Sequence, residues 1–195
     1  MMVSSLRFSY QASKGVACYS IPMPITPVHM GTALAAKVIA PRYFSFVVFG
    51  ITQVAIDAEA AFYLLTDDPP YHRILHTYLG ATVVALLAVV IGRPLLGHVL
   101  RLWNRLVRAD RESLLWIEPR VPLVAAASGA LIGGYSHVLL DSFLYSDMHP
   151  ISPLSDSNAM LTMLSTLEVY ALCFALGLLG AVALAAKWLW RRCSG

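Results

Sequence analysis

Long apolar segments alternate with short polar connections along this chain, and four of these segments have the length that a lipid bilayer requires. They cover residues 43–65, 74–91, 122–145 and 161–190. A bilayer core about 30 Å thick needs roughly 20 helical residues. Backbone groups in lipid must be satisfied within the protein, which favours helices. We therefore predict an all-α fold, a polytopic membrane helix bundle with four transmembrane helices.

A short N-terminal helix is predicted over residues 27–40, with Thr26 as its N-cap and Pro27 at its first position. Its length of about 14 residues, or roughly 21 Å, is too short to cross a bilayer. We expect a partial-depth helix that descends from the outer side and turns back at Pro41 into the first span. A helix lying laterally on the cytoplasmic side is the alternative interpretation.

Residues 95–107 have a different pattern, in which apolar side chains recur at helical spacing and arginines share the opposite side with His98. This pattern predicts a cytoplasmic amphipathic helix whose basic face meets anionic headgroups. A calmodulin-target helix has a similar pattern, but the neighbouring span favours the lipid interpretation.

Charge placement predicts the orientation of the chain in the membrane. Most of the 14 Lys and Arg residues lie in segments 93–120 and 187–192, whereas the connections 66–73 and 146–160 are mainly acidic. Basic connections remain on the cytoplasmic side. We expect a cytoplasmic C-terminus in an integral protein of a bacterial or archaeal cytoplasmic membrane.

Composition narrows the possible classes of protein. Hydrophobic residues make up 58% and charged residues 13%, about half of the roughly 25% charged residues usual in soluble domains. These values exclude a disordered chain, a nucleic-acid binder with a basic surface, and most soluble enzymes. The lipid bilayer is the expected partner, and no feature indicates an oligomeric state. We expect a loose tail over residues 1–22, one membrane-embedded domain over 23–192 and a short tail over 193–195.

Ionisable residues inside membrane spans are costly, so they are usually paired and functional. In this chain they gather near the outer ends of the predicted spans. The candidates are His29, Asp57, Glu59, His72, His76, His137, Asp141, Asp147 and Glu168. His98 lies apart in the basic amphipathic helix, where we expect it to be solvated.

Two pairs of these residues have the spacing of metal ligands on one helix face. His72 and His76 are four residues apart, and so are His137 and Asp141. Imidazole and carboxylate ligands suit zinc, and also manganese or iron. No thiolate joins them, because the three cysteines have no CxxC spacing. The predicted ligands of one or two divalent ions are His29, Asp57, His72, His76, His137, Asp141 and Asp147.

The two acids of the first span have different expected roles. Asp57 and Glu59 diverge by about 200° on a regular helix. Asp57 ranks ahead as a ligand because Gln53 lies one turn before it on the same face. This leaves Glu59 or Glu168 as a catalytic general base. The glycines of the third and fourth spans are expected to be helix-packing positions.

Several strings of the chain match a known family in the right order. These are MPITPVHMGTAL, then DAE at the end of a span, then YHRILHTYLGA, then GGYSHVLLDSFLYSDMHPISPLS, which together cover about residues 23–168. The chain resembles the predicted membrane-bound metal-dependent hydrolases of the inner-membrane, LexA-associated type. The resemblance implies that His29, Asp57, Glu59, His72, His76, His137 and Asp141 gather around metal. A more distant likeness is to zinc-dependent phospholipase C and single-strand nuclease folds, which also use an H-x-x-x-D pair.

These features predict a membrane-embedded metal-dependent hydrolase that acts at the extracytoplasmic face on a phosphoester or on another small amphipathic or lipid-derived substrate. The alternative is a non-enzymatic protein that binds or transports ions through the same cluster. The inner halves of the later spans are apolar, which favours a one-sided pocket over a channel. A third hypothesis is a structural protein in which the metal only holds the spans together.

Overall fold

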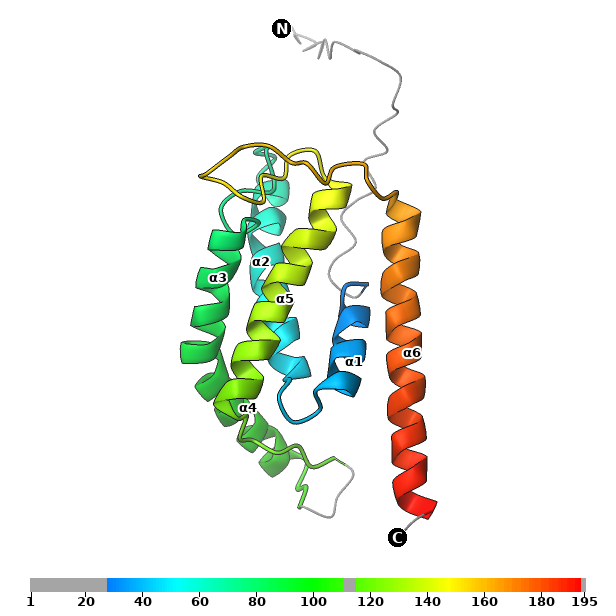
Figure 1. Cartoon of the computed structure of the whole chain (residues 1–195). Helices are drawn as coiled ribbons and strands as arrows, with labels where there is room; N and C mark the ends of the chain where they lie inside the picture. The colour runs from blue at the N-terminus through cyan, green and yellow to red at the C-terminus, as the bar shows by residue number, and fades with distance from the viewer. Residues whose placement is uncertain (1–27, 111–114, 194–195) are drawn as a thin grey trace, which may run out of the picture.

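The computed structural model describes residues 28–110 and 115–193, and every regular element in those ranges is helical. The all-α prediction is confirmed. The elements in chain order are α1 (Met30–Ile39), α2 (Phe46–Leu65), α3 (Tyr78–Leu87), η1 (Ala88–Gly92), α4 (Arg93–Leu106), α5 (Leu123–Leu144) and α6 (Thr166–Cys193). Figure 1 shows α2, α3 and α5 grouped together in the bundle, with α6 packed beside α1. The predicted tail over residues 1–22 lies outside the described residues, and Cys193 belongs to α6 rather than to a C-terminal tail.

The four predicted spans are confirmed as helices that are long and apolar enough to cross a membrane. They cover Phe46–Leu65, Tyr78–Leu106, Leu123–Leu144 and Thr166–Trp190. Much of their outer surface is apolar and exposed, as lipid-facing helices require.

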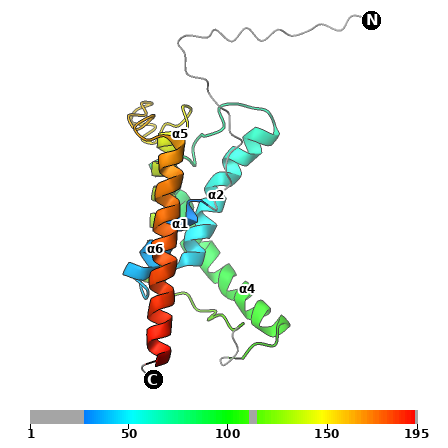
Figure 2. The ribbon, with the colours of Figure 1, turned by 90° about the vertical axis from the view of Figure 1, so that its right-hand side faces the viewer.

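The second span differs from the prediction at both ends. It begins at Tyr78 rather than at residue 74, because Thr77 has an extended backbone and its hydroxyl accepts a hydrogen bond from the Gly80 amide at 2.9 Å. At the other end, α3 continues through the single π-helical turn η1 into the amphipathic helix α4. The amphipathic helix is therefore an extension of the span, and Figure 2 shows α4 leaning away from the bundle.

The short N-terminal helix is also present, and it runs antiparallel to α2 between the α2/α5 pair and α6 (Figure 1). It begins at Met30 with His29 at the N-cap position, so the helix starts three residues after the predicted first position. Thr26 and Pro27 lie outside the described residues. The amine of Lys37 donates to the Pro41 and Phe44 carbonyl oxygens, at 2.8 and 2.9 Å, and fixes the turn into α2. The arrangement agrees with a partial-depth helix rather than a lateral one.

Glycines on α5 allow it to approach α2 closely. A Cβ atom on Gly129 would lie 2.4 Å from the Ser45 carbonyl oxygen, and one on Gly133 would lie 2.8 Å from the Phe49 carbonyl oxygen. Each contact pair lies one helical turn beyond the previous one on both helices. This register places Asp57 of α2 close to His137 of α5, with Asp57 Oδ1 3.2 Å from His137 Nε2.

Candidate metal centre

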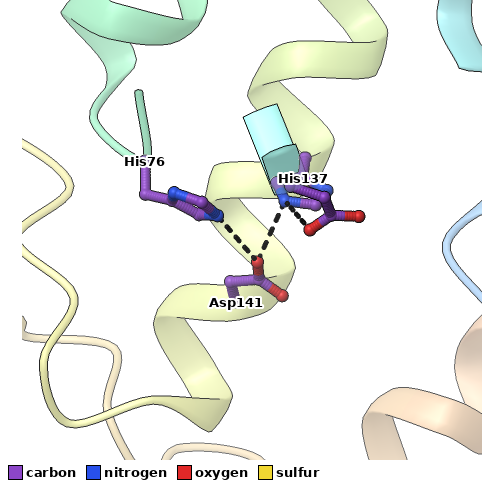
Figure 3. Close-up of side chains that lie close together, drawn as sticks. His76, His137 and Asp141 are labelled. Carbon is purple, nitrogen blue, oxygen red and sulfur yellow. Dashed lines mark ion pairs between the residues drawn. The ribbon is translucent and has the colours of Figure 1, made fainter. Parts of the chain in front are cut away.

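Four side chains from three parts of the chain converge inside the bundle. Asp57 comes from α2, His76 from the loop before α3, and His137 and Asp141 from α5. One possible ligand atom of each lies within 4.8 Å of those of the other three. His76, His137 and Asp141 are buried. Figure 3 shows both imidazoles directed toward the Asp141 carboxylate.

The α5 pair is at the middle of this group. His137 Nε2 lies 3.1 Å from Asp141 Oδ2 and 3.2 Å from Asp57 Oδ1. His76 Nε2 lies 4.0 Å from Asp141 Oδ2. His137 and Asp141 share one face of α5 because they are one helical turn apart, as their spacing predicts. The group therefore combines two imidazoles and two carboxylates, a donor set suited to zinc, manganese or iron.

His29 adjoins the group from the beginning of α1. Its Nδ1 lies 3.4 Å from His137 Nδ1, and its Nε2 lies 3.7 Å from Asp141 Oδ1. The two carboxylate oxygens of Asp141 thus face different histidines. Only the partial depth of α1 gives His29 this position, because a helix that crossed the bundle would carry its N-terminus past the group.

Glu59 holds the loop that carries His76. Its Oε2 lies 3.1 Å from His76 Nδ1, and its carboxylate accepts hydrogen bonds from the amides of Arg73, at 3.2 Å, and Leu75, at 3.0 and 3.1 Å. Burial lowers the pKa of His76, although the bond to Glu59 acts in the opposite direction. This role differs from the predicted general base, because the Glu59 carboxylate is already engaged by these donors.

Asp147 holds His72 in a similar way. Its Oδ1 lies 2.8 Å from His72 Nδ1, and its Oδ2 accepts from the amides of Tyr71 and His72 at 3.0 and 3.2 Å. Burial raises the pKa of Asp147, but these hydrogen bonds outweigh burial and bring it to about 2. Asp147 was predicted to be a metal ligand, but its carboxylate binds His72 and therefore orients this imidazole. The His72 ring stacks on Tyr145 with a centroid distance of 4.3 Å and lies outside the four-residue group.

The prediction that His72 and His76 share one face of a helix is wrong, although their side chains do lie close together. Both lie in the irregular loop before α3, and their ring centroids are 4.7 Å apart. The loop is shaped by hydrogen bonds from its amides to Glu59 and Asp147, not by helical periodicity. Gly80 lets the loop lie against α3, since a Cβ there would be 1.9 Å from the Ile74 carbonyl oxygen.

The far nitrogens of four histidines have no hydrogen-bond partner. In the described part of the chain, the buried side-chain atoms without one are His29 Nε2, His72 Nε2, His76 Nε2, His137 Nε2 and Gln53 Oε1. Buried polar atoms are normally satisfied, so this concentration on imidazole nitrogens requires an explanation. Metal-binding histidines commonly offer one nitrogen to the ion and the other to a carboxylate. His76, with Nδ1 on Glu59 and Nε2 toward Asp141, has that arrangement. The residues present therefore fit a metal ion.

Glu168 is the candidate that the structure does not bring to the group. The fourth span begins at Thr166 rather than at residue 161, so Glu168 lies in the first turn of α6, and it is exposed. Its carboxylate accepts from the amide and hydroxyl of Ser165, both at 2.7 Å, while the Ser165 hydroxyl accepts from the Glu168 amide at 3.3 Å. This reciprocal pair is a capping box. The S-x-x-E spacing of Ser165 and Glu168 therefore indicates that Glu168 caps α6 and is not a catalytic residue.

Two further residues belong to the surroundings of the group. Gln53 is fully buried one turn before Asp57, and its amide nitrogen lies 3.5 Å from the Gly133 carbonyl oxygen. Tyr145 was missed by the sequence interpretation, and its only sequence signal is its position four residues after Asp141. His98 is exposed on α4, as expected for a solvated residue.

No protein-family model, no curated protein and no solved structure matches the chain. The fold and site by themselves define a helical protein with four candidate membrane spans and a buried His/Asp group that could hold a metal ion. A functional hypothesis therefore depends on the chemistry of this group.

Proposed function

We propose that this protein is a membrane-embedded metal-dependent hydrolase acting on a phosphoester or a lipid-like substrate. The observation that carries the proposal is that the buried Nε2 atoms of His76 and His137, for which no hydrogen bond is found, both face the Asp141 carboxylate. A divalent ion would satisfy these atoms together. When bound, it would supply positive charge that polarises a scissile group and makes a nearby water more acidic.

We assign one ion to His76, His137, Asp141 and Asp57, with zinc as the first choice. Glu59 orients His76 through its Nδ1 atom, so that the other ring nitrogen is directed to the group. His29 lies at the edge, close enough to Asp141 to hydrogen-bond a bound substrate or to stabilise the carboxylate.

Asp57 has two carboxylate oxygens, and we propose that one of them binds the ion while the other is the proton acceptor, in place of Glu59 and Glu168. Its side chain is 22% exposed, compared with 5% for Asp141. Water can therefore reach Asp57 more readily than the rest of the group. A carboxylate beside a polarised scissile group can accept the proton of the attacking water.

The depth of the group supports an amphipathic substrate. The loop with His76 and the connection with Asp147 cap the same end of the bundle, at the top of Figure 1, and α4 lies at the other end. His76 lies at this end, whereas Asp57 and His137 lie about two turns inside α2 and α5, so the group is just below headgroup depth if the helices cross a bilayer. By the charge asymmetry this end is extracytoplasmic, in a cytoplasmic membrane with the C-terminus inside.

The proposal is tested by metal analysis of the purified protein and its His→Ala variants. We expect about one zinc per chain in the wild type, and loss of that zinc in His137→Ala and His76→Ala. His98→Ala is the matched control, because His98 is exposed on α4, and it should retain the metal. Full metal retention in both site variants would remove the proposal.

Turnover is tested with a chromogenic phosphodiester and with phospholipids in mixed micelles. Asp57→Asn should retain at least part of the metal and lose most of the hydrolysis. A loaded wild type that hydrolyses neither ester class, but moves metal into liposomes, would instead favour the ion-binding or transport alternative.

A further inference from the structure

Residues 115–122 form a strap that lies along α4. The buried Asn104 side chain donates to the Ile117 carbonyl oxygen at 2.8 Å and accepts from the Ile117 amide at 3.1 Å. Farther along, Arg93 Nε donates to the Val121 carbonyl oxygen at 2.7 Å. The strap, residues 115–122, is thus tied to both ends of α4.

A pocket of about 500 Å³ lies between α4 and the strap. Its lining includes Arg93, Gly97, His98, Arg101, Pro119 and Arg120. Gly97 is essential to this shape, because a Cβ atom there would lie 3.0 Å from the Pro119 carbonyl oxygen and 3.6 Å from Arg101 Nη1. The absent side chain leaves space beside the Arg101 guanidinium.

The lining is strongly basic. Arg93, Arg101 and Arg120 contribute three positive charges, and none of the lining residues that the structure describes is acidic. None of these three arginines forms an ion pair with another described residue. The arginine that does form one among the described residues is Arg73, with Asp68, and it does not line the pocket. The nearby Glu118 carboxylate accepts from the backbone amide of Arg120, at 3.4 Å. Guanidinium groups bind phosphate oxygens with paired hydrogen bonds, so an anionic phosphate fits this lining.

We propose that this pocket binds the phosphate of an anionic phospholipid headgroup. The apolar side chains of Leu95 and Leu102 on α4 are 60% and 55% exposed. An oblique helix with such side chains next to arginines can place them among acyl chains while the arginines reach phosphates. A soluble phosphate would contact only the arginines, whereas a phospholipid would contact both the arginines and the exposed leucines of α4. The pocket is lined by α4 and the strap, and Figure 1 shows α4 at the bundle end opposite the loop before α3, so the inference does not depend on the proposed function.

The experiment titrates detergent-solubilised full-length protein with short-chain phosphatidylglycerol, phosphatidylcholine and glycerol 1-phosphate, and it counts bound lipid by native mass spectrometry. Arg101→Ala and Arg120→Ala remove charges from the pocket at exposed positions. Arg42→Ala is the matched control, because Arg42 is exposed in the turn between α1 and α2, at the same bundle end, and does not line the pocket.

We expect each pocket variant to weaken phosphatidylglycerol binding about fivefold, the effect of one basic residue near an anionic surface. Arg42→Ala should bind like the wild type, and wild-type binding should weaken as salt increases. Equal binding of phosphatidylcholine, equal binding of glycerol 1-phosphate, or unchanged binding in both pocket variants would overturn the proposal. The salt series on the unmodified protein tests the charge dependence even if a variant folds poorly.

Discussion

Glu59 on α2 and His76 in the loop before α3 form a pair in which the carboxylate Oε2 lies 3.1 Å from the imidazole Nδ1. The same carboxylate accepts two backbone amides of the loop. His76 Nε2 is consequently directed toward Asp141. One acid thus fixes both the path of the loop and the orientation of the imidazole.

Replacing this acid tests its supporting role. We expect Glu59→Gln to lower metal affinity by about 10- to 100-fold, the usual cost of losing a carboxylate behind a metal-binding histidine. Glu168→Gln is the matched control, because Glu168 caps α6 and does not contact the group. Equilibrium titration with zinc and a competing chelator measures both affinities. Equal affinities in the two variants would contradict the role of Glu59.

The histidine pair of the loop is predicted to be unequal. His76 belongs to the four-residue group, whereas His72 does not. We expect His76→Ala to lose the ion and His72→Ala to retain it at one per chain, as measured by elemental analysis of dialysed protein. A content that falls from two ions to one in His72→Ala would show that a second ion is present.

Removing the metal should destabilise the protein, because the group joins α2, α5 and the loop before α3. An ion at about 100 times its Kd adds roughly 2.7 kcal/mol, which corresponds to a Tm change of roughly 5–10 °C for a chain of this size. We expect a chelator to lower the Tm of the wild type and of His98→Ala by this amount. His137→Ala should melt at the lower temperature with or without chelator, and a chelator-induced shift in that variant would place the ion elsewhere.

The close approach of α2 and α5 can be tested at Gly133. A methyl group there would lie 2.8 Å from the Phe49 carbonyl oxygen, so the helices must separate. We expect Gly133→Ala to cost about 1–3 kcal/mol, as overpacking usually does, and to weaken metal binding because Asp57 and His137 move apart. Gly92→Ala is the control, since its nearest contacts would be at 3.8 Å. Thermal melting and zinc titration measure the two effects, and identical behaviour of the two variants would contradict the packing argument.

The sequence by itself determined the features that depend on local pattern. Apolar segment length identified the four spans, because the thickness of a bilayer sets the length of a crossing helix. The H-x-x-x-D spacing identified the His137 and Asp141 pair, because residues one turn apart on a helix share a face. These predictions needed no knowledge of which helices are neighbours.

Only the tertiary structure decided which acid supports which histidine. Asp147 reaches His72 across 75 positions of sequence, and Glu59 reaches His76 across 17. The loop bearing both histidines is not helical, so periodicity could not place them. Glu168 was misplaced for a related reason, since a carboxylate at a helix start can bond its own cap instead of a distant site. The pairs Asp147–His72 and Glu59–His76 depend on how the helices and loops pack together, and the spacing of residues along the chain does not reveal that packing.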